Sequence, residues 1–191
     1  MKTLKKIVFP LFSLFLLYRS VELVKTLMVS GSSEHTVGEQ FLLAFLLSIF
    51  ITGVFAIVGF AWPTSKIFPR SFYTLKNAGI LKKTYRILGV DLFRKALLIF
   101  FWGRKKNRKK YFDGTRKGLQ NFIYQSKQSE FGHFASFVSI ALVSFLFLAK
   151  GMFLLVAFLT LINVIGNFYP VILQRYHRLR IDKLQSRLAT D

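Results

Sequence analysis

Two long apolar runs limit this chain to a membrane fold more than any other feature of its sequence. Residues 41–62 and 151–173 contain no charged side chain. A hydrocarbon core of roughly 30 Å is crossed by about 20 helical residues, so each run is long enough to span it. The alternative, two buried helices of a soluble globule, fits runs of this length less well. We therefore predict an all-α integral membrane protein.

Two further segments bring the predicted number of transmembrane helices to about four: residues 7–28, which include Arg19, Glu22 and Lys25, and the shorter apolar run at 134–149. Basic residues precede the first segment, as they do in a cleaved signal peptide. No small-x-small cleavage pattern follows Tyr18, which favours a retained helix. Only Lys150-Gly151 separates the third crossing from the fourth, so we expect these two helices to form a tight hairpin.

The charge distribution predicts the orientation of these crossings. The chain has a formal net charge of +20, and Lys and Arg are concentrated in the loop at 63–133 and the tail at 174–191. The short connection at 30–40 contains Glu34 and Glu39 but no Lys or Arg. Because basic loops stay on the cytoplasmic side, we expect both termini and the long loop to be cytoplasmic. The whole chain, 1–191, is then a single membrane domain.

The long loop is too apolar to be only a linker. Residues 71–88 interleave Lys and Arg with Leu, Ile and Tyr. Residues 92–102 are apolar apart from Arg94 and Lys95 but too short to span. Both segments therefore predict interfacial helices. A basic run follows: Arg104, Lys105, Lys106, Arg108, Lys109 and Lys110. Such a run binds anionic headgroups or, alternatively, the phosphates of an acyl donor. Nucleic acid is a weaker interpretation, because the positive-inside rule already explains much of the charge.

Several kinds of chemistry are excluded by composition. The chain contains no Cys, which excludes disulfides, thiolate metal sites and a protein-bound thioester. With three His and eight acidic residues, a histidine-rich metal centre is not expected. We therefore predict neither a metal site nor a resident cofactor.

The predicted hairpin brings two polar stretches to one membrane face. With its turn at Lys150-Gly151 and a rise of about 1.5 Å per residue, His133 reaches about the level of Phe168 and Glu130 that of Val171, and Asn167 and Gln174 bracket this level on the facing helix. Glu130 and His133 are three residues apart and share a helix face. A carboxylate beside an imidazole favours a general base that deprotonates a hydroxyl. The alternative is structural, with both residues pairing with Arg175 or Arg178 to hold the helix ends together.

Several of these segments together resemble one family. They are Trp62-Pro63 with Lys66-Ile67-Phe68-Pro69, Tyr85-Arg86-Ile87-Leu88-Gly89-Val90, Glu130-x-x-His133, and Asn167-x-x-Pro170-x-x-x-Gln174-Arg175-Tyr176-x-Arg178-x-Arg180. In these segments, over residues from about 60 to 182, the chain resembles the glycosyl-4,4'-diaponeurosporenoate acyltransferases.

The resemblance implies a bacterial enzyme of the cytoplasmic membrane that adds a fatty acyl group to a sugar hydroxyl of a glycosylated carotenoid. An acyl donor such as acyl-CoA would be the co-substrate, and membrane lipids and the hydrophobic acceptor would be the partners. Glu130 and His133 are the catalytic candidates, and Asn167, Gln174, Arg175 and Arg178 the substrate-binding ones. The basic run at 104–110 and Phe112-Asp113-Gly114-Thr115 depart from the family pattern, which leaves room for a different lipid acceptor.

Three alternatives stay open at this point. His177 and Asp182 have the His-x4-Asp spacing of glycerolipid acyltransferases, although on a basic tail that lacks the other hallmarks of those enzymes. A non-catalytic scaffold or accessory subunit would use the basic loop only to hold anionic lipid. A small transporter is the weakest alternative, since Asn163 is the main polar residue at mid-depth in the third and fourth crossings.

Overall fold

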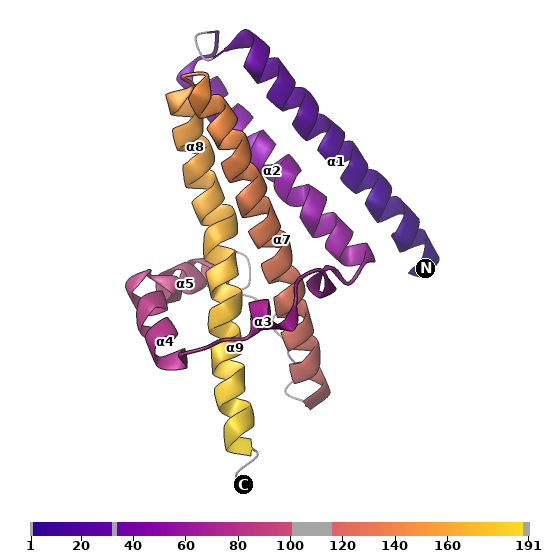
Figure 1. Cartoon of the computed structure of the whole chain (residues 1–191), viewed down its shortest axis with the longest axis vertical. Coiled ribbons are helices and arrows are strands. Elements are labelled where there is room, and N and C mark those ends of the chain that lie inside the picture. Colours follow the sequence, from indigo (N-terminus) through magenta and orange to yellow (C-terminus); the bar gives the residue numbers. More distant parts are fainter. Residues whose placement is uncertain (1, 32–33, 101–115, 189–191) are drawn as a thin grey trace. The chain divides into compact units, whose positions relative to one another are not determined.

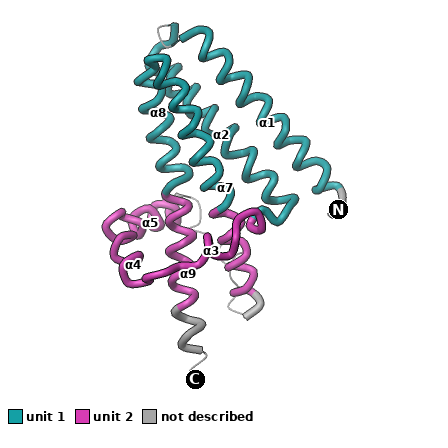
Figure 2. Tube along the Cα trace, viewed as in Figure 1, with its two compact units in different colours: residues 1–64, 131–168 teal, residues 65–130, 169–191 magenta. Residues whose placement is uncertain are grey.

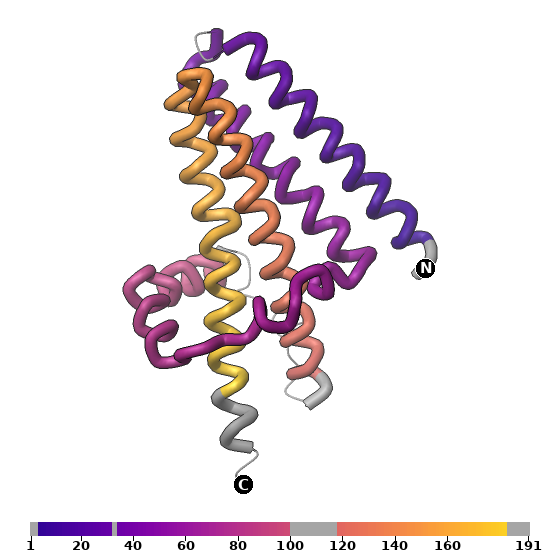
Figure 3. Tube along the Cα trace, in the orientation of Figure 1, coloured from indigo at the N-terminus to yellow at the C-terminus, as the bar shows by residue number. Residues whose placement is uncertain are grey.

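The computed structural model describes residues 2–31, 34–100 and 116–188, and in these residues every regular element is a helix (Figures 1 and 3). The elements are α1 (Lys2–Ser30), α2 (Val37–Ala61), η1 (Thr64–Lys66), α3 (Arg70–Tyr73), α4 (Ala78–Ile87), α5 (Val90–Phe100), α7 (Arg116–Ala149), α8 (Phe153–Asn163), η2 (Val164–Phe168) and α9 (Tyr169–Leu188). The basic run at 104–110 lies outside the described residues.

Four segments of the described chain are long and apolar enough to cross a membrane, which confirms the predicted fold class. They are Leu4–Ser30, Val37–Ala61, Gly118–Ala149 and Phe153–Asp182. The predicted crossing at 134–149 is the C-terminal part of α7, a continuous helix from Arg116 to Ala149 that also includes the polar residues before it. The protein is therefore an all-helical membrane protein.

The chain forms two compact units, which Figure 2 distinguishes by colour. Unit 1 contains residues 1–64 and 131–168, and unit 2 contains residues 65–130 and 169–191. Helix α7 contributes residues 131–149 to the first unit and residues 116–130 to the second.

Unit 1 is built around a cluster of buried apolar side chains. Its buried side chains come from α1, α2, α7 and α8 and include Leu27, Leu47, Ile140, Phe147, Leu155 and Leu159. Ser13 Oγ also donates to the Val54 carbonyl, at 2.9 Å, and so links α1 to α2. Helix α2 begins at a capping box, in which Thr36 Oγ1 accepts from the Glu39 amide and the Glu39 carboxylate accepts from the Thr36 amide.

The predicted tight turn at Lys150-Gly151 is present and ends α7. The Met152 amide donates to the Phe147 carbonyl and the Gly151 amide to the Leu148 carbonyl, each at 3.0 Å. This is the Schellman pattern, which requires a left-handed residue just after the helix. Gly151 supplies it with φ +72°, and the buried Phe147 and Met152 provide the accompanying apolar pair.

We expect Gly151→Ala to destabilise unit 1 by about 1 kcal/mol, the usual penalty for an L side chain in the left-handed region. An added Cβ would meet only the Phe153 ring, at 4.0 Å, so the effect comes from backbone strain rather than a clash. Thermal unfolding in detergent would measure it. Gly38→Ala is the matched control, because nothing lies within 4 Å of a Cβ at that position and its φ is not positive. An unchanged midpoint for Gly151→Ala would contradict this account of the turn.

The fourth crossing is interrupted by a short turn just before Pro170. Pro170 has no amide hydrogen, so it cannot donate to the Gly166 carbonyl as an α-helical residue would. In this place the chain forms the π-helical turn η2. Such turns occur mostly as local insertions in α-helices and are frequent at functional sites.

Unit 2 contains the helices of the loop together with α9 and the start of α7. In α4 the buried Tyr85 packs edge-on against Tyr176 of α9, with ring centroids 6.4 Å apart. The large apolar residues Ile80 and Ile87 are 67% and 77% exposed, and in α5 Leu92 and Ile99 are 73% and 76% exposed. Each pair is seven residues apart and therefore lies on one helix face. An exposed apolar face flanked by Lys and Arg is typical of interfacial helices.

We predict that α4 and α5 lie at the membrane interface. A spin label at Ile80→Cys or Ile99→Cys of this Cys-free chain should be shielded from an aqueous relaxation agent and accessible to oxygen. A label at Lys82→Cys, roughly opposite Ile80 on α4, is the control and should stay accessible to the aqueous agent. Equal aqueous access at all three positions would rule out the interfacial placement.

Candidate functional site

The candidate residues form two buried polar clusters, one in each unit. Unit 2 contains Glu130, Arg175 and Arg178. Unit 1 contains His133 and Asn167. Glu130 and His133 are three residues apart in α7, as predicted, but each has its own partners.

The Glu130 cluster consists of one carboxylate and two arginines. The Glu130 side chain has no exposed surface, and Arg175 Nε donates to its Oε1 at 2.6 Å. Arg178 Nη2 donates to Oε2, and its side chain is also buried. Both carboxylate oxygens therefore accept from a guanidinium. A carboxylate without solvent is stabilised only by such charged donors.

Side chains around this cluster hold the two arginines in place. Arg178 Nη1 donates to Ser126 Oγ at 3.0 Å, and Ser126 Oγ donates to the Gln174 carbonyl at 3.2 Å. The guanidinium of Arg175 lies 5.0 Å from the centre of the Phe72 ring, and that of Arg178 lies 5.8 Å from the Tyr73 ring. These are cation–π distances.

Two buried donors in this cluster lack a hydrogen-bond partner. Among the described residues, the Tyr73 hydroxyl and Arg178 Nε are buried and unpaired. Burial, and next the Glu130 carboxylate, raise the pKa of Tyr73 to about 12. The phenol thus keeps its proton and remains a donor. Because an unpaired buried donor costs about 1–3 kcal/mol, the cluster has capacity to bind one more acceptor.

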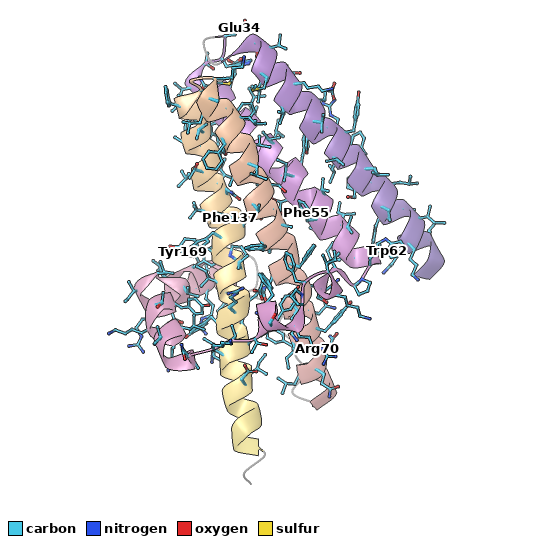
Figure 4. The ribbon with its side chains drawn as sticks, viewed as in Figure 1. Glu34, Phe55, Trp62, Arg70, Phe137 and Tyr169 are labelled. Carbon is cyan, nitrogen blue, oxygen red and sulfur yellow. The ribbon has the colours of Figure 1, made fainter. Side chains whose placement is uncertain are left out.

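The His133 cluster is a chain of side-chain amides in unit 1. His133 Nδ1 lies 3.1 Å from Asn167 Oδ1. Asn167 Nδ2 donates to Asn163 Oδ1 at 3.0 Å, and Asn163 Nδ2 donates to the carbonyl of Phe137, which Figure 4 labels, also at 3.0 Å. Thr52 Oγ1 lies within hydrogen-bond distance of both Asn167 Oδ1 and Asn167 Nδ2. The imidazole also hydrogen-bonds to the backbone of Gly166.

The predicted site residues are thus brought together in two groups rather than one. Arg175 and Arg178 join Glu130, and Asn167 joins His133. Gln174 enters the Glu130 cluster through its backbone carbonyl. The arginine pairing foreseen as the structural alternative is present for Glu130. The direct orientation of His133 by Glu130 stays a prediction.

Three residues of these clusters were not predicted from the sequence: Thr52, Tyr73 and Ser126. Asn163 was noted only as a polar residue at mid-depth, and its hydrogen bonds to Asn167 and Phe137 were not predicted. Asn163 and Asn167 carried a usable signal, because amides four residues apart in an apolar run lie on one helix face and are costly there unless paired. Thr52 carried none, since a single Thr is common in transmembrane helices. His177, of the alternative tail pair, packs its ring against Phe122 at 5.8 Å.

Fold and clusters define a helical membrane protein with ionisable side chains at buried positions, where such groups are usually functional. A family model described as Glycosyl-4,4'-diaponeurosporenoate acyltransferase matches residues 69–187, well over half of the chain. The chain belongs to this family, and the resemblance predicted from its sequence is confirmed. Comparisons with curated proteins and with solved structures found no match.

Proposed function

We propose that this protein is a membrane-bound O-acyltransferase that moves a fatty acyl group onto a hydroxyl of a glycosylated lipid such as a glycosyl carotenoid. The observation that carries the proposal is the family match over residues 69–187, which includes both Glu130 and His133. A partly buried imidazole with a defined partner supports it, because acyl transfer to a hydroxyl needs a base of this kind.

His133 is the proposed base. It takes the proton of the acceptor hydroxyl as that oxygen attacks the carbonyl carbon of an acyl thioester such as acyl-CoA. The tetrahedral intermediate collapses with cleavage of the carbon–sulfur bond, and the thiolate leaves with the proton that His133 held. Asn167 and Gln174 are the candidates for amide donors to the intermediate's oxyanion. The Asn167 Nδ2 group already donates to Asn163 and Thr52.

The Glu130 cluster is proposed to bind a polar substrate group. Two arginines face one carboxylate, and Lys127 Nζ lies 5.7 Å from the Tyr73 ring, so positive charge is in excess. The unpaired donors of Tyr73 and Arg178 need an acceptor. A phosphate or sugar oxygen meets both requirements. For the basic run at 104–110 the proposed ligands are anionic lipid or the donor phosphates.

The proposal is tested with purified protein in lipid nanodiscs, radiolabelled acyl-CoA and a glycosylated C30 carotenoid acceptor. An acyl ester that forms only when all three are present supports it. If ester forms with a glycolipid but not with the carotenoid, the chemistry stands and the acceptor is wrong. No transfer to either, together with retention of anionic lipid by the protein, would favour the scaffold alternative.

We further propose a bacterial cytoplasmic membrane with both termini inside. In this Cys-free chain, Glu34→Cys should react with an impermeant maleimide on intact cells. Lys76→Cys, which is exposed in the basic loop, should react only after the membrane is opened. The reverse pattern would invert the topology.

A further inference from the structure

We propose that Asn163 sets the tautomer of His133. It does so through Asn167, placing the proton on Nδ1 and leaving Nε2 as the nitrogen that accepts the proton of the acceptor hydroxyl. Asn163 and Asn167 are then positioning residues. The assignment of the tautomer rests on the hydrogen-bond network alone, and only its effect on rate rests on the proposed function.

The direction of the network follows from its fixed end. The Phe137 carbonyl can only accept, so the Asn163 group facing it at 3.0 Å is Nδ2. Asn163 therefore turns Oδ1 toward Asn167, where only Nδ2 can donate to it, again at 3.0 Å. Asn167 must then turn Oδ1 toward His133 Nδ1, at 3.1 Å. Two acceptors cannot share this contact, so Nδ1 carries the hydrogen.

Thr52 holds Asn167 but does not decide its direction. Its hydroxyl lies 3.1 Å from Asn167 Nδ2 and 3.3 Å from Oδ1. A hydroxyl both donates and accepts, so it can satisfy the amide in either orientation. Only the backbone carbonyl at the far end breaks this symmetry. The network therefore predicts different outcomes for removal of Asn163 and removal of Thr52.

Because the two amides are buried, their hydrogen bonds can fix the tautomer of His133. Asn163 is 3% exposed and Asn167 is 1% exposed, so water does not compete for their hydrogen bonds. A neutral imidazole with its hydrogen on Nδ1 has its lone pair on Nε2. During transfer Nε2 takes the hydroxyl proton, and the resulting imidazolium keeps its Nδ1 hydrogen bond to Asn167. The competing acceptor is the Gly166 backbone, which also hydrogen-bonds to this ring.

The tautomer is measured directly by nitrogen-15 NMR of the histidine-labelled protein in lipid, at a pH where the ring is neutral. His133→Gln identifies the His133 signals among those of the three histidines. We expect the proton on Nδ1 in the native protein and a mixture of tautomers in Asn163→Leu. Thr52→Val should keep the native tautomer. Ser136→Ala is the matched control, since within the described part of the chain this buried hydroxyl bonds only to the Gly132 carbonyl of its own helix.

A proton on Nε2 in the native protein would overturn the inference and point to Gly166 as the partner that decides. So would an unchanged tautomer in folded Asn163→Leu. In the acyl transfer assay, Asn163→Leu should lower kcat roughly 10- to 100-fold with KM unchanged, a part of the 10²–10⁴ that a general base contributes. If the tautomer is as predicted and His133→Ala is fully active, the proposed function of His133 fails while the assignment stands.

Discussion

His133→Ala should lose nearly all acyl transfer while the protein still inserts and purifies. A general base contributes about 10²–10⁴ in rate, and within the described chain the other histidines have different surroundings: His35 lies beside Ser30 and His177 beside Phe122. After truncation of His133, Asn167 Oδ1 still has a donor, the Thr52 hydroxyl at 3.3 Å. The fold should therefore tolerate the change. Product formation at matched expression, with thermal unfolding in parallel, measures both effects.

His177→Ala is the control for this prediction. It removes the histidine of the His-x4-Asp pair, and we expect activity within a few fold of the native protein. Loss of activity in His177→Ala combined with full activity in His133→Ala would transfer the role of base to the tail pair. A loss in both variants with native unfolding temperatures would mean that each residue is needed, which contradicts the single-base mechanism.

The fold followed from sequence because its main determinants are local. An uncharged run such as 41–62 can only be helical in a bilayer, since every backbone group must be paired within the segment. The turn at Lys150-Gly151 was also predictable, because only a residue that tolerates positive φ ends a helix in this way. Glu130 was expected on one helix face with His133, and both residues lie in α7. Arg175 and Arg178 of α9 balance the charge of Glu130 there.

The sequence predicted which residues form the site better than it predicted the hydrogen bonds and ion pairs between them. The hairpin register brought Asn167 to the level of His133, and the two side chains do meet. The partner of Glu130 could not be decided, because His133 and the arginines were both within reach of a helical register. The orientation of the two amides was beyond sequence reasoning altogether. It depends on one backbone carbonyl, that of Phe137, whose availability is a property of tertiary packing.

Removing Glu130 should have the largest effect on stability. Glu130→Leu leaves the guanidinium of Arg178, whose side chain is 4% exposed, without a counter-charge. Breaking a buried ion pair in this way costs about 3–5 kcal/mol. We expect a clearly lower unfolding temperature in detergent and a reduced yield of monodisperse protein. Asp91→Asn is the control in the same unit, because the Asp91–Arg94 pair is 43% and 29% exposed and such pairs contribute about 0–1 kcal/mol. Equal losses in the two variants would contradict the argument from burial.

The double variant Glu130→Leu with Arg178→Met separates a structural role from a binding role. Replacing a buried ion pair by apolar side chains of similar size is often neutral or stabilising, and Arg175, at 29% exposure, can reach solvent. We therefore expect the double variant to recover most of the stability that Glu130→Leu loses. If acyl transfer recovers as well, the cluster only holds unit 2 together. If stability returns without activity, and the KM for acyl donor or acceptor has risen, the two arginines bind substrate, as their surplus positive charge and the unpaired donors of Tyr73 and Arg178 predict.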